Sequence, residues 1–197
     1  MLSQRINLIA YSTLAVIICY IDRVNISVAI IPMQEQFGWS DSQVGFIFSS
    51  FYLGYMLTMA LGGYLSDKFG GKRVLGWGVV LWSIFTILTP LAAHNGFFAL
   101  FFIRILMGIG EGVTFPAWHS LYARWIPFNE RTRAIAFTNS GVSIGTIIGY
   151  IGTQMIILAM GWEWAFYIFG IVGLVWFIFW NRNVTSYPNE DKRISVE

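Results

Sequence analysis

Charged residues are scarce in this chain. They make up 11% of its 197 residues, against roughly 25% in a soluble domain, while 56% of the residues are hydrophobic. A soluble fold of this size has too small an interior for that much apolar surface, so the composition excludes a soluble globular domain and indicates an integral membrane protein. The net charge of only +2 gives no sign of a nucleic-acid partner.

Cysteine occurs once, as Cys19, which excludes an intrachain disulfide. Cys19 lies in an apolar run, where we expect it to be a small packing residue. That first run is longer than a signal-peptide core, contains Asp22 and Arg23, and is followed by no small-residue cleavage site. We therefore expect it to be retained as a first helix. We also expect no cofactor and no bound metal.

Long apolar runs are what the chain has instead. A membrane-spanning helix needs about 20 mostly apolar residues. Six runs meet this length, which predicts an all-α, multi-pass membrane protein. Residues 1–181 would form a six-helix transmembrane bundle and residues 182–197 a polar tail. The expected helices cover residues 6–31, 43–66, 73–93, 97–122, 133–160 and 164–181.

Basic residues gather in alternate connections between these runs, and the connections in between carry neither Lys nor Arg. Because positive loops stay on the cytoplasmic side, this pattern predicts that both termini are cytoplasmic. The compact loops suggest a bacterial inner membrane. Ten of the twelve Lys and Arg residues lie on this side, namely Arg5, Lys68, Lys72, Arg73, Arg124, Arg131, Arg133, Arg182, Lys192 and Arg193.

The remaining two basic residues, Arg23 and Arg104, lie inside predicted spans, as do Asp22 and Glu111. A charged side chain at the bilayer centre costs roughly 2.5–3.5 kcal/mol on insertion scales, so such residues indicate function by default. With a rise of about 1.5 Å per residue, Asp22, Arg23 and Arg104 fall at a similar depth. The plainer alternative is a buried ion pair that only holds the bundle together.

These residue types suit one chemistry. An arginine presents a fork of donors to a carboxylate or phosphate, and a carboxylate buried in low dielectric can take up and release protons near neutral pH. The combination predicts an anion–proton symporter. Tyr55, near mid-depth in the second run, is equally compatible with anion binding and with ordinary aromatic packing.

The segment Gly63–Arg73 reads Gly-Tyr-Leu-Ser-Asp-Lys-Phe-Gly-Gly-Lys-Arg and resembles the signature loop between the second and third helices of the major facilitator superfamily. The resemblance implies twelve-helix transporters built from two halves, of which this chain would be the N-terminal one. It also implies a conformational gate at this loop. The gate residues would be Gly63, Asp67, Gly70, Lys72 and Arg73.

Within that superfamily the chain is similar to the anion:cation symporters, through residues 20–26, Gly54-Tyr55 and the stretch 104–116. The resemblance implies that Arg23 and Tyr55 contact the substrate anion. It further implies that Asp22 and Glu111 are protonation sites and that Arg104 is their partner. The expected function is proton-coupled symport of a small organic anion, such as a sugar acid, by alternating access.

Half a transporter would need a second six-helix half, in the same or a separate chain, beside its substrate and the lipid bilayer. Two other functions remain possible from the sequence: a non-transporting subunit or fragment, and an intramembrane serine protease using Ser140 and His119. The protease lacks the glycine expected two residues before the serine, because Thr138 stands there. The sequence leaves open which anion is carried and whether protons or sodium ions are coupled.

Overall fold

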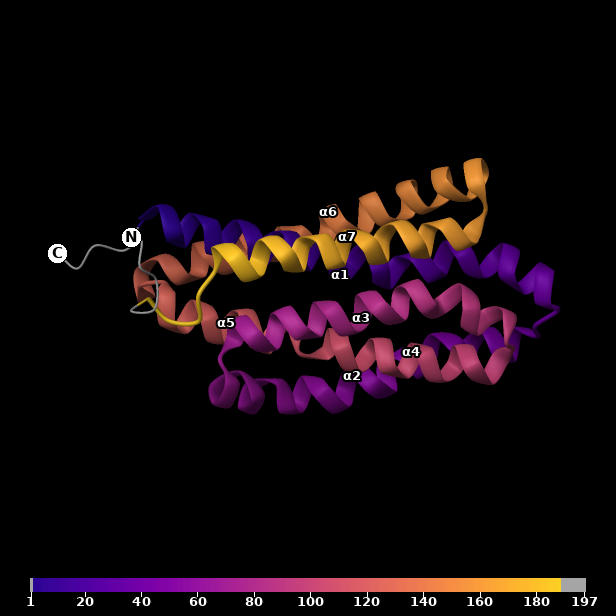
Figure 1. Ribbon diagram of the computed structural model, residues 1–197, viewed down its shortest axis with the longest axis horizontal. Helices are drawn as coiled ribbons and strands as arrows, with labels where there is room; N and C mark the ends of the chain where they lie inside the picture. Colours follow the sequence, from indigo (N-terminus) through magenta and orange to yellow (C-terminus); the bar gives the residue numbers. More distant parts are fainter. Residues whose placement is uncertain (1, 189–197) are drawn as a thin grey trace.

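The structure is a computed structural model that describes residues 2–188, and its helices run nearly side by side along one axis (Figure 1). Six segments of the described chain are long and apolar enough to cross a membrane, with α4 and α5 together forming one of them. The prediction of an all-α fold with six spanning helices is confirmed. The helices are α1 (Leu2–Phe37), α2 (Asp41–Phe69), α3 (Gly71–His94), α4 (Phe97–Gly112), α5 (Thr114–Trp125), α6 (Phe128–Met160) and α7 (Trp162–Asn183).

Several expected helix ends were wrong. The first helix was expected to stop at residue 31, but α1 continues through Pro32 to Phe37. The fifth was expected to begin at residue 133, but α6 begins at Phe128, directly after Pro127. Both errors have one cause: the apolar runs mark the part of a helix that lies in the membrane, and the helices extend past it. Of the expected tail, residues 189–197 lie outside the described part of the chain.

The fourth span is divided. Val113, with φ −79° and ψ −11°, separates α4 from α5, so the break lies three residues before Pro116. Pro116 falls in the first turn of α5, where its missing N–H removes no helical hydrogen bond. At the break the carbonyl of Val113 accepts from the Ala117 N–H at 3.0 Å.

Glycines set the spacing between paired helices. A Cβ on Gly54 of α2 would overlap the backbone of Ile105 on α4, and a Cβ on Gly108 would overlap the backbone of Phe51 on α2. On α6, Gly145 lies in the same way against Ile17 of α1. Gly141 and Gly149 of α6 also face α1 at short distance. These contacts pack α2 closely on α4 and α6 closely on α1.

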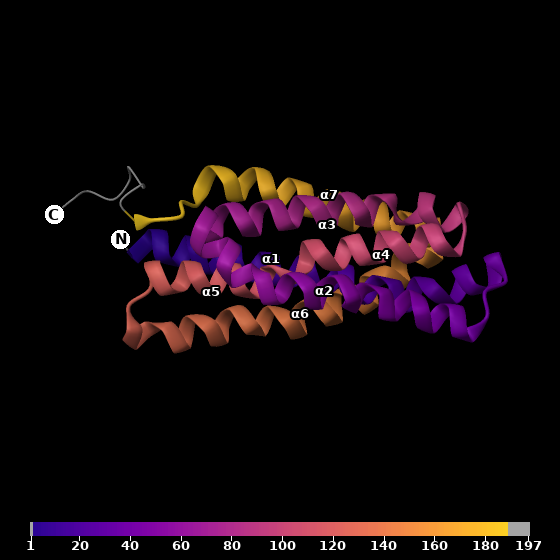
Figure 2. The same ribbon diagram turned by 90° about the horizontal axis from the view of Figure 1, so that it is seen from below.

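The beginning of α1 and the end of α7 lie at the same end of the bundle (Figures 1 and 2). At the opposite end Ser40 begins α2 with a capping box, in which the Gln43 side chain accepts from the Ser40 N–H at 2.9 Å. Such reciprocal bonds satisfy two otherwise free donors of the first helical turn. The turn after α1 therefore has a defined end point, which fixes where α2 enters the bundle.

Candidate functional site

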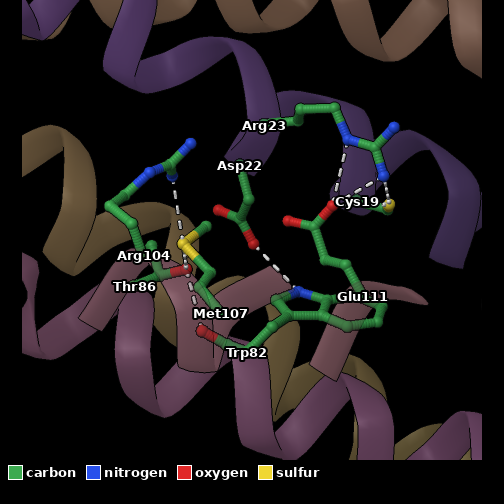
Figure 3. A network of polar contacts seen from close by, with 8 residues as sticks. All are labelled: Cys19, Asp22, Arg23, Trp82, Thr86, Arg104, Met107 and Glu111. Carbon is green, nitrogen blue, oxygen red and sulfur yellow. Dashed lines mark hydrogen bonds and ion pairs between the residues drawn. The ribbon is translucent and has the colours of Figure 1, made fainter. Parts of the chain in front are cut away.

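The intramembrane charges gather in one place, where α1, α3 and α4 approach each other (Figure 3). Asp22 and Arg23 come from α1, and Arg104 and Glu111 from α4. The side chains of Asp22 and Glu111 are fully buried and Arg104 is 2% exposed. The close packing of α4 on α2 through Gly108 holds this part of α4 against its neighbours. The sequence predicted a similar depth for Asp22, Arg23 and Arg104, and the structure brings these three residues together with Glu111 (Figure 3).

Arg23 and Glu111 form the central ion pair. The guanidinium donates from Nε and Nη2 to one oxygen, Oε2, at 3.1 and 2.9 Å. The Cys19 thiol donates to the same oxygen at 3.3 Å. The second oxygen, Oε1, has no partner among the described residues. Residues of α1 thus make three contacts with one oxygen of Glu111, while its other oxygen is buried and accepts no hydrogen bond from the described residues.

Aromatic rings surround the guanidinium of Arg23. Its Cζ lies 4.8 Å from the ring centre of Tyr20, 5.2 Å from that of Phe51 and 4.7 Å from that of Tyr55. Cation–π contacts of this kind hold an arginine in place without neutralising its charge. The structure therefore brings together the two predicted anion-binding residues, Arg23 and Tyr55.

Asp22 turns away from Arg23, toward α3. Its Oδ2 accepts from the indole N–H of Trp82 at 3.1 Å, and its Oδ1 has no partner among the described residues. Adjacent residues on a helix point about 100° apart, which explains why neighbouring charges on α1 face different helices. The second expected protonation site is therefore a separate buried carboxyl group, held by one neutral donor.

Arg104 was expected to pair with Asp22 or Glu111, and no such ion pair occurs among the described residues. Its Nη1 donates to the Met107 sulfur at 3.3 Å, and its Cζ lies 5.0 Å from the ring centre of Phe51. Its Nε has no partner in the described chain. The pairing fails because Glu111 lies two turns further along α4, where Arg23 already occupies it.

The predicted gate residues surround the α2–α3 turn. Asp67 forms an ion pair with Arg124 of α5, with Nη2 to Oδ1 at 3.1 Å, and Ser120 also donates to it at 3.4 Å. Gly70 has a φ of +86°, a conformation that favours glycine, and it links α2 directly to α3. Lys72 donates to the carbonyl of Asn181 at 2.9 Å. The turn therefore contacts both α5 and α7.

Gly63 and Arg73 contribute differently to this region. The structure has open space where a Cβ on Gly63 would lie, so the described packing gives no reason for glycine there. Arg73 is exposed at the start of α3.

Cys19, Trp82 and Phe51 touch the charged groups and were missed from the sequence. Cys19 was expected only to fill space, yet it donates to Glu111. The sequence could have predicted that Cys19 lies beside Arg23, because residues four apart share a helix face and Cys19 precedes Arg23 by four. Trp82 and Phe51 gave no such signal, since their role depends on which helices become neighbours.

The protease alternative finds no support in the geometry. The Ser140 hydroxyl donates to the carbonyl of Phe137 on its own helix, at 2.6 Å. The His119 Nδ1 lies 2.7 Å from the carbonyl oxygen of Phe115, also on its own helix, and the ring stacks on Trp118. Neither side chain contacts the other in the described chain.

The sequence profile of the Major Facilitator Superfamily matches residues 12–195. The chain belongs to the major facilitator superfamily. This confirms the resemblance drawn from the signature loop, and the matched region corresponds to the N-terminal half of the superfamily's fold. Members of this superfamily are transporters rather than enzymes, which excludes the protease.

Several relatives are anion transporters by name. The chain is 49% identical over 179 residues to "Probable anion transporter 4, chloroplastic" of Oryza sativa subsp. japonica, covering 91% of this chain and 30% of the relative. It is 47% identical over 181 residues to "Ascorbate transporter, chloroplastic" of Arabidopsis thaliana, covering 92% and 34%. It is 45% identical over 183 residues to "Sodium-dependent phosphate transport protein 1, chloroplastic" of Arabidopsis thaliana, covering 93% and 36%.

The chain spans about a third of the length of these curated relatives. Their names place them in chloroplasts, which counts against the bacterial inner membrane expected from the loops. The superfamily match shows an integral, multi-pass membrane protein.

Solved transporters share the fold at low identity. A proton:xylose symporter bound to 6-bromo-6-deoxy-D-glucose superposes with a TM-score of 0.82 at 21% identity, covering 94% of this chain and 46% of that chain. A bacterial homolog of the human lysosomal transporter Spinster, inward-facing and unoccupied, gives 0.79 at 24% identity, covering 94% and 44%. At these identities the likeness shows the fold alone.

Proposed function

We propose that the chain is the N-terminal half of a proton-coupled transporter of organic anions that works by alternating access. The observation that carries the proposal is the ion pair of Arg23 with Glu111, in which the carboxylate is fully buried and the arginine side chain is 15% exposed. Charges inside a membrane span are costly to insert, so their presence indicates a transport pathway by default.

The pair would work by competition. A guanidinium binds planar anions through parallel N–H donors, and here two of those donors are engaged by a single oxygen of Glu111. An entering carboxylate or phosphate would compete with Glu111 for Arg23. Protonation of Glu111 would weaken its hold on Arg23 and so favour the anion, and by linkage the bound anion would favour the proton. This mutual dependence is what symport requires.

Asp22 and Arg104 complete the proposed proton-coupling set. Asp22 supports this role because it is fully buried and one of its oxygens has no partner among the described residues. Arg104 would add positive potential to the same region without neutralising either carboxyl group. Tyr55, in contact with the guanidinium of Arg23, would line the anion site.

The α2–α3 turn would serve as the gate. Asp67 is 76% exposed and pairs with Arg124 on a different helix, so the contact can break at little cost when the bundle moves. Gly70 would support the turn through its backbone conformation, and Lys72 and Arg73 through their basic charge. Gly63 stays a proposed gate residue on the sequence pattern alone. A full cycle needs a second six-helix half against which this one can rock.

The second half would pack on exposed apolar faces of α2 and α6. The mid-helix residues Met56 and Leu57 of α2, and Ile147 and Ile151 of α6, are exposed apolar side chains. Residues 2–183 would form the bundle, and the following residues would begin the link to the second half. The alternative, a non-transporting subunit or fragment, would need no such contact.

The names of the relatives bear on the proposed substrate and on the proposed membrane. One is named for ascorbate and one for phosphate, and both are anions that an arginine can bind. We propose a small carboxylate or enolate anion as the substrate class and a chloroplast membrane as the location, with both termini on one side. Protons are the proposed coupling ion because the buried carboxyl groups can carry them.

The test is uptake into liposomes. The chain would be reconstituted alone and together with the C-terminal half of the Arabidopsis ascorbate transporter. Uptake of labelled ascorbate, glucuronate and phosphate would be followed under an inward proton gradient and, separately, an inward sodium gradient. Glu111→Gln would accompany Glu35→Gln, a control that removes an exposed carboxylate.

Three outcomes are informative. Proton-driven uptake that Glu111→Gln abolishes and Glu35→Gln preserves supports the proposal. Uptake driven only by sodium refutes proton coupling. Absence of uptake by the chain in both forms favours the non-transporting alternative.

A further inference from the structure

A polar cavity of about 470 Å³ lies where the α2–α3 turn meets the end of α7. Lys68, Lys72 and Arg73 contribute to its wall from the turn, and Ser186 from the segment after α7. Lys72 spans the gap by donating to the Asn181 carbonyl at 2.9 Å. The cavity is therefore lined by basic side chains at the end of the bundle where α1 begins and α7 ends.

A second cavity, of about 450 Å³, adjoins the first along the outside of α2, α3 and α4. Its wall is almost entirely apolar and includes Leu65, Leu81 and Ile109. Phe69, Arg73 and Trp77 line both cavities. The two cavities are therefore adjacent, one with a basic wall and the other with an apolar wall.

One face of α3 shows this change of character residue by residue. Arg73, Trp77 and Leu81 are four residues apart, so they lie along the same face over about 12 Å. Arginine, tryptophan and leucine in this order match the charged surface, the interface and the hydrocarbon of a bilayer. Trp77 is 64% exposed although it is large and apolar, which indicates a surface made for contact with lipid.

Two of the basic side chains at this site, Lys68 and Arg73, form no ion pair with the described residues. The Lys68 ammonium lies 5.4 Å from the ring centre of Phe69, which leaves its charge intact. An occupant with a negative charge would therefore be stabilised here.

We propose that the two cavities bind one anionic phospholipid, with its phosphate at Lys68 and Arg73 and an acyl chain along Trp77 and Leu81. A free anion would fill only the polar cavity, and a neutral lipid would bring no negative charge to Lys68 and Arg73. Basic pockets between transmembrane helices at the membrane surface are suited to anionic headgroups. The lipid would tie the α2–α3 turn to the end of α7.

The test measures lipid binding by the whole purified chain. Native mass spectrometry in detergent would compare phosphatidylglycerol with phosphatidylcholine of the same acyl chains. We expect phosphatidylglycerol to bind more tightly, and Arg73→Gln to weaken its binding about fivefold, the usual effect of one basic residue near an anionic lipid. Arg182→Gln removes the same charge from the end of α7 outside both cavities, and should change binding less than about twofold. Lys68→Gln serves as a second variant if Arg73→Gln does not fold.

A further variant distinguishes a lipid from a free anion. Leu81→Trp would fill the apolar cavity without touching the basic one, and Ile171→Trp on the exposed face of α7 is its control. A lipid site predicts that Leu81→Trp weakens phosphatidylglycerol and Ile171→Trp does not. Three results would overturn the proposal: equal binding of the two lipids, equal loss in the Arg73 and Arg182 variants, or displacement of phosphatidylglycerol by millimolar inorganic phosphate with no effect of Leu81→Trp. All three results are measured as lipid binding, so they do not depend on the outcome of the transport assays.

Discussion

Arg23 and Glu111 are joined through a single carboxylate oxygen. Nε and Nη2 of the arginine both donate to Oε2, and Oε1 accepts nothing from the described residues (Figure 3). A bidentate arginine–carboxylate pair would use both oxygens. The pair in this chain therefore has fewer hydrogen bonds than a bidentate pair, which is compatible with the proposed breaking of the pair when an anion binds.

Replacing Arg23 by lysine should therefore weaken anion binding more than it lowers the stability of the fold. A lysine keeps the positive charge for Glu111 but offers one compact ammonium in place of a planar fork. We expect affinity for the transported anion to fall about tenfold or more, since charge-assisted bidentate bonds are among the strongest hydrogen bonds. Binding can be measured by scintillation proximity with labelled anion.

Arg182→Lys is the matched control for this change, because Arg182 is exposed at the end of α7 and contacts none of the site residues in the described structure. Unaltered affinity in Arg23→Lys would mean that the anion is bound elsewhere.

The sequence predicted the elements of this site better than their partners. Apolar runs located all six spans, and the charges within them marked Asp22, Arg23, Arg104 and Glu111. Depth counting predicted a similar level for Asp22, Arg23 and Arg104. It could not tell which way each side chain faces, because helix rotation is set by packing such as that of Gly108 on Phe51. This is why Arg104 was assigned to the carboxylates and instead contacts Met107.

The partner of Asp22 gives a second prediction. Trp82 supplies the one hydrogen bond that this buried carboxyl group has in the described structure. Trp82→Phe keeps most of the ring volume and removes the donor, so it should lower the free energy of unfolding by about 1–3 kcal/mol, the usual cost of an unsatisfied buried group. Thermal unfolding in detergent measures the loss.

Two further variants show whether that loss comes from the hydrogen bond. Trp164→Phe, at an exposed tryptophan, should change stability by no more than about 0.5 kcal/mol. In an Asp22→Asn background the cost of Trp82→Phe should shrink, because the group left behind is then neutral. An equal cost in both backgrounds would assign the effect to packing of the indole.

The crossing of α2 and α4 gives a third prediction. An alanine at Gly54 would place its Cβ against the backbone of Ile105 and Ile109, where nothing can move aside cheaply. Gly54→Ala should destabilise by about 1–3 kcal/mol, as overpacking does. Gly45→Ala on the same helix meets open space and should be neutral or stabilising by up to about 1 kcal/mol, because alanine favours the helix. A stable Gly54→Ala would show that the two helices can separate freely.

The proposed gate residues were identified from a sequence pattern rather than from physical reasoning about the chain. Spacing alone does not reveal that Asp67 reaches Arg124, because these residues are far apart in the chain and meet only once α2 and α5 are packed. The basic character of the turn was visible in the sequence, whereas the cavity it borders depends on where α7 ends. Sequence therefore indicates which residues are unusual, and the fold decides what they touch.

The ion pair of Asp67 with Arg124 gives the last prediction. It tests whether the pair acts as a conformational gate or as a fixed structural contact. Because Asp67 is 76% exposed, breaking the pair with Asp67→Asn should cost no more than about 1 kcal/mol of stability. In a transporter assembled from both halves, however, the same change should shift the balance between inward- and outward-open states, which spin-label distances across the bundle would report. The charge-swapped double variant, Asp67→Arg with Arg124→Asp, should move that balance back toward the original. A loss of stability well above 1 kcal/mol, with no change in the distances, would make the pair a fixed structural contact and leave the gate to other residues of the turn.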